Sequence, residues 1–479
     1  MKFDRVEGDR LFGMSGADGQ GMQRTFSLRP TVTASVEADG STSLASWPRH
    51  DVIGRLDAAQ HEALRRLATR SLTVDELTQG RSRTEASSTL ALLERLNGAG
   101  WLVTTVRERG LALYSIEPHS RPPTPPDQSG PGTLSAFTLI RRRDGDTVAE
   151  NPLSWCDVRV HDARVLGLLT GLQAGEPLPS SVRDAALVDL LWTGMMVTDA
   201  AVDATPSRRR WSLHELWFNQ RSGMGRRGWG VEPFGATSWA SGVVAPLPAG
   251  RPAYPGPHVE LAVPDLDRLR AEDVSLTAAV EDRSSTRAFD DDRPLTLDQL
   301  AELLFRTART RSVRVAGAVE VPSRPYPSGG SMYELEVYPV VRHLDGLTAG
   351  MYHYDTVDHV LRPVADATHP AVERLLSAAS ISLTDRTAPQ VLLVIAARPG
   401  RLMDTYEQMG YSLILKHAGV LTQTISLVAT AMGLGCVAVG AGDTTAFTEA
   451  TGADPLDECA VGDVALGSIL PAGTGTDAS

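Results

Sequence analysis

Two short segments in the C-terminal half of the chain carry residues that could bind an anionic, planar ligand. In the first, residues 283–287 (RSSTR), Arg283 and Arg287 flank the hydroxyl groups of Ser284 and Ser285. Guanidinium groups bind phosphate through bidentate, charge-assisted hydrogen bonds, and serine hydroxyls can add further hydrogen bonds. Taken alone, such a segment is also typical of a solvated polar turn.

The second segment is a glycine-rich turn formed by Pro327, Ser328, Gly329 and Gly330. Glycines let backbone N–H groups approach a planar or anionic group closely. Many tight turns share this composition, so the turn by itself indicates little. Neither segment matches GxxxxGK[ST] or a strand-borne GxGxxG, which excludes those two nucleotide-binding motifs.

The residues around these segments predict helices mixed with strands. The stretch Leu276–Asp282 precedes the arginine segment, and an amphipathic helix with an N-cap threonine spans Thr296–Ala308. One long helix is expected over Tyr406–Met432, ended by glycines. The pattern predicts an α+β domain over residues 258–479. Its strand-like apolar runs are Leu335–Val341, Gly350–Asp355, Gln390–Ala396, Cys436–Val439 and Ala460–Gly467.

Two stretches rich in proline and glycine, Arg121–Gly132 and Ala245–Pro257, interrupt the chain and are expected to be linkers. They divide it into blocks 1–120, 133–244 and 258–479. A chain of 479 residues is long enough for two to four domains of roughly 100–200 residues each.

The first block predicts a winged-helix-like module, because three capped helices precede a two-stranded hairpin. Its third helix carries one arginine and two glutamates, which favours a peptide or protein partner over DNA. The expected elements are Asp57–Thr69, Thr73–Gln79, Thr84–Asn97, Trp101–Val106 and Leu111–Ile116.

The second block is interpreted as a degenerate repeat of the first, and hence as a second winged-helix-like module. A strand-like run over Leu134–Arg142 is followed by helical patterns over His161–Leu172 and Arg183–Met196. The block ends in the aromatic stretch Trp211–Trp229, which has three tryptophans. This stretch either packs the N-terminal half onto the next domain or contacts a peptide.

Composition excludes several classes of protein. With 46 basic and 58 acidic residues the net charge is -12, which argues against a broad nucleic-acid-binding surface. The three cysteines, Cys156, Cys436 and Cys459, are too far apart for a disulfide framework or a Cys-rich zinc site, and no metal is expected. Without a run of about 18 apolar residues or a signal peptide, we expect a cytoplasmic protein with no membrane span.

The order of the motifs in residues 270–470 resembles the nitroreductase superfamily. The arginine segment, an amphipathic helix, the glycine-rich turn, a strand with EVYP, YHYD, a long helix and GLG follow one another. More narrowly, this order is similar to that of SagB-type dehydrogenases, flavin oxidases that form thiazoles and oxazoles in ribosomal peptides. The stretch Trp211–Trp229 also resembles a segment that precedes the oxidase domain in longer members.

The resemblance implies an α+β fold with FMN bound at the interface of an obligate homodimer. Arg283, Ser284, Ser285 and Arg287 would bind the phosphate and ribityl chain, whereas residues 327–330 would line the isoalloxazine ring. The residues that complete the implied FMN site are Gln423, Val439, Gly440 and Ala441. The implied reaction removes a hydride and a proton from a thiazoline or oxazoline, and oxygen reoxidises the flavin.

The chain departs from this family at the expected catalytic base. Azole-forming members carry a Lys-Tyr pair before the long helix, whereas this chain has Thr405 and Tyr406. Arg401 is a poor proton acceptor, and Lys416 lies ten residues beyond Tyr406. Tyr406 is therefore the candidate catalytic residue, with a purely structural hydroxyl as the alternative.

The sequence is compatible with three functions. The first is an FMN-dependent azoline dehydrogenase whose N-terminal modules bind a precursor peptide or a cyclodehydratase. The second is an NAD(P)H-dependent nitroreductase or flavin reductase. The third is a catalytically silent scaffold that binds the precursor peptide. His353 and His417 are expected to be packing or surface residues rather than ligands.

Overall fold

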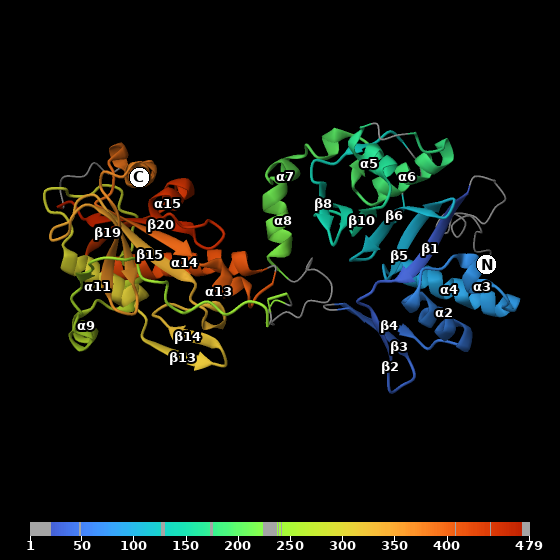
Figure 1. Ribbon diagram of the computed structural model, residues 1–479, viewed down its shortest axis with the longest axis horizontal. Helices are drawn as coiled ribbons and strands as arrows, with labels where there is room; N and C mark the ends of the chain where they lie inside the picture. Colours follow the sequence, from blue (N-terminus) through green and yellow to red (C-terminus); the bar gives the residue numbers. More distant parts are fainter. Residues whose placement is uncertain are drawn as a thin grey trace. The chain divides into compact units, whose positions relative to one another are not determined.

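Contacts within the chain separate it into two units, Met1–Glu232 and Pro233–Ser479, drawn in Figure 1. The three-block division expected from the proline-rich stretches, with its boundaries, stays a prediction. The computed structural model describes residues 21–46, 49–125, 130–172, 176–223, 237, 239–240, 242–407, 409–440 and 442–471.

A six-stranded antiparallel sheet forms the centre of the N-terminal unit, in the order β1-β5-β6-β10-β9-β8. Strands from both sides of the proline-rich stretch Arg121–Gly132 therefore pair within one sheet. The strands of this sheet are β1 (Met22–Leu28), β5 (Leu102–Glu108), β6 (Leu111–Pro118), β8 (Leu139–Arg143), β9 (Asp146–Glu150) and β10 (Cys156–Val160). Two smaller sheets contain β2 (Thr33–Val36), β3 (Thr42–Ser46) and β4 (Arg49–Gly54), and β7 (Thr133–Leu134) with β11 (Met196–Val197).

The helices of this unit pack on the sheet in two groups. Buried side chains of α2 and α4 join those of β1 and β5 in one core, and those of α5 and α6 join β6 and β10 in another. The helices are α2 (Ala58–Thr69), α3 (Val74–Thr78), α4 (Arg83–Gly98), α5 (Ala163–Thr170), α6 (Ser180–Trp192), α7 (Pro206–Arg209) and α8 (Leu213–Arg221), with a 3-10 turn η1 (Ala200–Val202).

The three predicted N-terminal helices and their hairpin are confirmed. Asp57, Thr73 and Ser82 each accept a backbone N–H at a helix start and close a capping box, which satisfies N–H groups that the helix leaves free. The predicted repeat misses β9 and β10, two short strands that lie between the predicted strand and the predicted helices. Whether either segment acts as a winged helix stays a prediction.

The C-terminal unit is built on a seven-stranded antiparallel sheet, in the order β12-β17-β16-β15-β18-β20-β19. The predicted strands β15 and β16 have the expected bounds, and β17 was not predicted. The strands are β12 (Val259–Glu260), β15 (Leu335–Val341), β16 (Gly350–Asp355), β17 (Val360–Asp366), β18 (Val391–Ala397), β19 (Leu434–Val439) and β20 (Cys459–Ser468), beside a separate hairpin of β13 (Ser312–Ala316) and β14 (Val319–Ser323).

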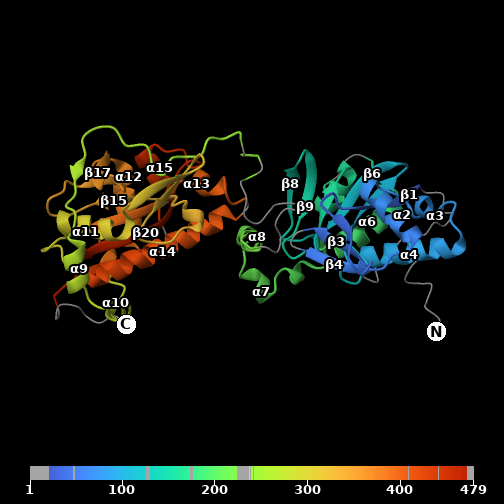
Figure 2. The ribbon, with the colours of Figure 1, turned by 90° about the horizontal axis from the view of Figure 1, so that it is seen from below.

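Helices cover both faces of this sheet. The helices α11 and α14 lie on one face and α12 and α15 on the other (Figures 1 and 2). Buried side chains of each pair of helices share a core with the sheet. Strands β15 and β18 are buried along their whole length, and β18 is apolar throughout, whereas β15 also carries the buried Glu336. The helices are α9 (Leu266–Glu272), α10 (Leu276–Asp282), α11 (Leu297–Ala308), α12 (Pro370–Ser380), α13 (Pro399–Met403), α14 (Gly410–Ala431) and α15 (Thr444–Thr451), with 3-10 turns η2 (Gly329–Ser331) and η3 (Thr384–Arg386).

The long helix begins later than predicted, which places Tyr406 outside it. Pro399 starts the short helix α13 instead, and Tyr406 lies in the turn between α13 and α14. By length and composition α14 could cross a membrane, a test that core helices also pass. Lys416, His417 and Gln423 interrupt its apolar sequence, so α14 does not overturn the sequence prediction that no run of about 18 apolar residues exists.

The stretch Ala245–Pro257 is extended, but it is not a free linker. The Ala249 amide donates to the Glu320 carboxylate, and Arg251 forms an ion pair with the buried Glu458. The Leu247 carbonyl accepts from Arg401. This stretch is therefore part of the packed C-terminal unit.

Candidate active site

The glycine-rich turn adopts a conformation that requires glycine at position 330. Gly330 has φ of 59°, in the left-handed region that side chains rarely adopt. A Cβ atom at this position would also lie 2.9 Å from Tyr406 Oη. The exposed backbone of the turn and the Tyr406 hydroxyl therefore lie directly against each other, although the two are far apart in sequence.

A buried histidine holds the neighbouring glycine. The Gly329 N–H donates to His417 Nε2 at 2.9 Å, and His417 Nδ1 lies 2.7 Å from Glu334 Oε1. The second carboxylate oxygen of Glu334 accepts from the Ser328 hydroxyl at 3.3 Å. The sequence prediction that His417 is a mere packing or surface residue is therefore incomplete, because its ring binds the candidate site directly.

The buried Arg401 on α13 holds the segment next to the turn. Arg401 donates to the carbonyls of Met332, Leu247 and Glu320. Burial lowers the pKa of Arg401 to about 10, and Arg324 and Arg398 nearby act in the same direction. Each of the three guanidinium nitrogens of Arg401 donates to a backbone carbonyl, so the side chain has a structural role.

The arginine segment lies against β19 and β20. The Thr286 N–H donates to the Cys436 carbonyl, and the Phe289 ring packs on Gly467, where a Cβ would lie 2.3 Å from Phe289 Cγ. The Arg287 carbonyl accepts from the Thr384 N–H. The backbone is thus fixed, while the side chains of Ser284, Ser285 and Arg287 stay exposed and available to a ligand.

The helix α14 contacts the glycine turn directly and is linked to the arginine segment through Cys436 of β19, whose carbonyl accepts from the Thr286 N–H. His417 on α14 holds the glycine turn, and Ser426 on α14 contacts Cys436 Sγ at 3.7 Å. The two contact points are nine residues apart, about 13 Å along the helix axis. Gln423 lies between them and is exposed.

The remaining predicted residues lie at the end of β19. Val439 is buried and Gly440 is exposed, while Ala441 lies outside the described residues. Burial raises the pKa of the Cys436 thiol to about 11, although the charge of Arg283 opposes this shift. Cys436 is therefore a neutral packing residue at neutral pH.

The arrangement fits a flavin mononucleotide. The exposed Arg287 guanidinium and the hydroxyl groups of Ser284 and Ser285 suit a phosphate, and the glycine turn brings its backbone up to Tyr406 with no space for a side chain at position 330. Sequence reasoning found both segments, but missed Glu334 and His417, whose pairing joins residues 83 positions apart.

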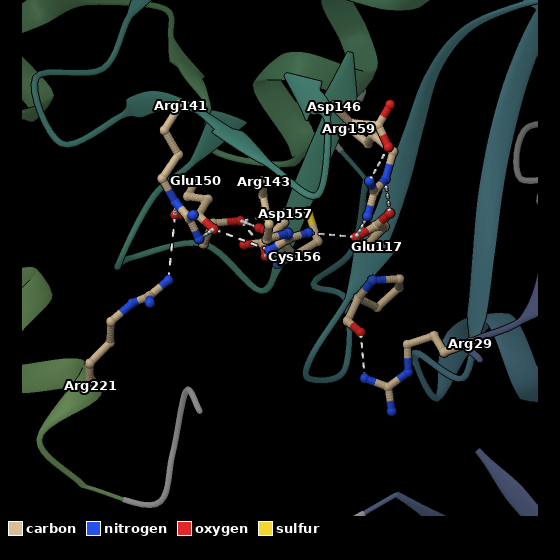
Figure 3. Close-up of polar contacts among 12 residues, drawn as sticks. Arg29, Glu117, Arg141, Arg143, Asp146, Glu150, Cys156, Asp157, Arg159 and Arg221 are labelled. Carbon is tan, nitrogen blue, oxygen red and sulfur yellow. Dashed lines mark hydrogen bonds and ion pairs between the residues drawn. The ribbon is translucent and has the colours of Figure 1, made fainter. Parts of the chain in front are cut away.

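A second polar cluster lies in the N-terminal unit, on strands β6, β8, β9 and β10 (Figure 3). Arg141 binds the buried Glu150 through two hydrogen bonds of 2.8 Å, and Arg143 also reaches Glu150. Arg221, at the end of α8, lies 3.5 Å from the same carboxylate. The cluster also contains ion pairs that join Arg143 to Glu117 and Asp157, and Arg159 to Glu117 and Asp146.

Two family models match the chain. The nitroreductase family model covers residues 280–468, and the cyanobactin oxidase ThcOx model covers residues 132–228. The first range contains the candidate site. The second contains most of the charged cluster and nearly all of the stretch Trp211–Trp229.

Individual proteins are also similar to this chain. The nitroreductase-like protein MJ1384 of Methanocaldococcus jannaschii is 30% identical over 186 residues, covering 39% of this chain and 86% of that protein. The chain therefore belongs to the nitroreductase family. The microcin B17-processing protein McbC of Escherichia coli is 31% identical over 115 residues, covering 23% of this chain and only 42% of McbC.

A solved structure of the Escherichia coli microcin synthetase complex McbBCD with truncated pro-MccB17 also matches. It has a TM-score of 0.33 and 20% identity, and the match covers 53% of this chain and 91% of the matched one.

Proposed function

We propose that the protein is an FMN-dependent dehydrogenase of the SagB type that oxidises thiazoline or oxazoline rings in a ribosomally made peptide to thiazoles or oxazoles. The observation that carries this proposal is the glycine turn, which lies between Tyr406 and His417 of α14, together with the link from α14 through Cys436 to the arginine segment. The similarity to the cyanobactin oxidase model and to McbC supports a role in peptide modification.

The residues of the chain divide into a phosphate end and a ring end. Arg283, Ser284, Ser285 and Arg287 would bind the phosphate and ribityl chain. Residues 327–330 would line the ring, with Gln423, Val439, Gly440 and Ala441 completing the site. When bound, FMN supplies the two-electron acceptor for the oxidation, with oxygen as the final acceptor.

Tyr406 is the candidate residue for handling the ring proton. Its hydroxyl lies against Gly330, so it faces the place where the reacting ring would sit. Thr405 Oγ1 instead contacts Met332 Sδ at 3.9 Å and cannot replace a lysine amine. Lys416 is exposed on α14, directly next to the buried His417, and thus lies on another face of the helix.

The partners follow from the same proposal. A precursor peptide that carries azolines would be the substrate, and a cyclodehydratase would supply its rings. We propose that the N-terminal unit contacts this peptide or enzyme. A homodimer is supported by exposed apolar side chains on the packed helices α10 and α14, namely Leu276, Val280, Tyr411 and Leu415.

The test is incubation of the purified protein with a synthetic thiazoline peptide in air. The proposal predicts the loss of two hydrogen atoms per ring, read by mass spectrometry, without added nicotinamide. Rapid bleaching of a bound flavin by NADPH, followed by nitroarene reduction and no change in the peptide, would instead assign a reductase. A protein that binds the peptide but no flavin would be a scaffold.

A further inference from the structure

The Glu334–His417 pair has a hydrogen-bonding pattern that fixes the state of the imidazole. The Gly329 amide can only donate, so His417 Nε2 must accept and carries no proton. The ring proton is therefore on Nδ1, which donates to Glu334 Oε1. The imidazole is thus held in one tautomer by the Glu334 carboxylate at Nδ1 and the Gly329 N–H at Nε2.

The same carboxylate reaches the turn by a second route. Glu334 Oε2 accepts from the Ser328 hydroxyl, and Ser328 Oγ in turn accepts from the Tyr333 N–H at 3.0 Å. Glu334 is fully buried, and His417 is only 7% exposed. One buried carboxylate therefore holds two consecutive residues of the turn, Ser328 directly and Gly329 through the histidine.

We propose that Glu334 and His417 are a positioning pair that holds the turn of residues 327–330 in the shape that receives the flavin ring. The identity of the ligand rests on the proposed function, whereas the hold on the turn does not. The Gly329 N–H is committed to His417 and is not available to the cofactor. The pair thus places Gly330 against Tyr406 Oη.

Two variants at position 417 separate this role from simple packing. An asparagine amide lies near the position of Nδ1, so His417→Asn keeps a donor for Glu334 but has no acceptor for Gly329. A glutamine amide lies near the position of Nε2, so His417→Gln keeps the acceptor for Gly329. Both variants remove the ring, so a packing role alone predicts similar effects.

The first measurement is hydrogen–deuterium exchange of peptides that span the turn, in the full-length protein without added FMN. The Gly329 amide should exchange roughly tenfold faster in His417→Asn than in the wild type, because its buried acceptor is lost. Exchange in His417→Gln should stay close to that of the wild type. Equal exchange in both variants would overturn the proposal.

The second measurement is FMN binding to the same proteins, followed by flavin fluorescence and by the flavin absorption spectrum. We expect His417→Asn to raise the dissociation constant about tenfold and His417→Gln to change it less than about threefold. Equal weakening in both variants would contradict the positioning role. If the wild type binds no FMN, the proposed function fails, while the exchange measurement still decides whether the pair holds the turn.

Discussion

The two polar clusters of this protein use similar residues but differ in where their hydrogen bonds lead. In the N-terminal sheet, arginines and carboxylates pair with one another across four strands, and Glu150 alone contacts three arginines (Figure 3). In the C-terminal unit, Glu334 pairs with His417, whose other nitrogen binds the backbone of an exposed glycine turn. The first cluster therefore joins strands, whereas the second shapes a surface that can receive a ligand.

The largest effect is expected at the glycine turn. In Gly330→Val the new side chain would have a left-handed φ and collide with Tyr406 Oη, so flavin binding and turnover should both be lost. The matched control is Gly317→Val, since Gly317 has φ of 63° but nothing within 4 Å of its Cβ position. Flavin fluorescence and peptide mass spectrometry measure the outcome. Full flavin binding by the Gly330 variant would place the ring elsewhere.

The N-terminal cluster should contribute to stability and not to flavin binding. Glu150→Ala leaves three arginines without a buried carboxylate, and we expect it to lower the free energy of unfolding by about 3 kcal/mol. Urea denaturation measures this change. Asp184→Asn, which removes only an exposed pair with Arg183, is the control. A loss of flavin from folded Glu150→Ala would contradict the separation of the two clusters.

Asp463 on β20 differs from the carboxylates of both clusters, because it forms no ion pair with any described residue of the C-terminal unit. Burial raises its pKa from 3.8 to about 6, so the folded state favours the protonated form. The protonated carboxyl therefore makes its full contribution to the free energy of unfolding below pH 3.8. That contribution is lost as the pH rises through about 6.

Asp463→Asn should therefore gain stability relative to the wild type between about pH 4 and pH 7, by about 3 kcal/mol. Thermal or urea unfolding across this range measures the difference. The exposed Asp457→Asn is the control and should show no such trend. A pH-independent difference for the Asp463 variant would show that its carboxyl is solvated.

The smallest effect is expected at the phosphate end of the proposed site. Arg287→Ala removes an exposed guanidinium and should weaken FMN binding about tenfold, close to 1.4 kcal/mol. Arg314→Ala, on the exposed hairpin strand β13, is the matched control and should bind FMN normally. Unchanged binding by Arg287→Ala would remove this residue from the phosphate site.

Local patterns predicted the C-terminal fold well, because they depend on residues that are neighbours in sequence. The runs Leu335–Val341 and Gly350–Asp355 are strands with the predicted bounds, and both consist mainly of buried apolar and aromatic residues. The short strands Asp146–Glu150 and Cys156–Val160 were missed. The first carries charges at both ends, Asp146 and Glu150, whose partners lie on other strands and on α8.

The candidate site was predicted only in part. The arginine segment and the glycine turn are visible as motifs, but the Glu334–His417 pair depends on a contact between the residue before β15 and α14 that no local pattern encodes. The position of Tyr406 in a turn follows from Pro399, which starts a separate short helix before α14. Tertiary packing, rather than local propensity, therefore decides which side chains face the turn.

The most direct test of the central claim is the amount of FMN released when the purified full-length protein is denatured. If the arginine segment and the glycine turn form one flavin site, reconstituted wild-type protein should release FMN in a fixed ratio to the chain, and Gly330→Val should release almost none. No FMN from the reconstituted wild type, or an equal amount from the variant, would contradict the account.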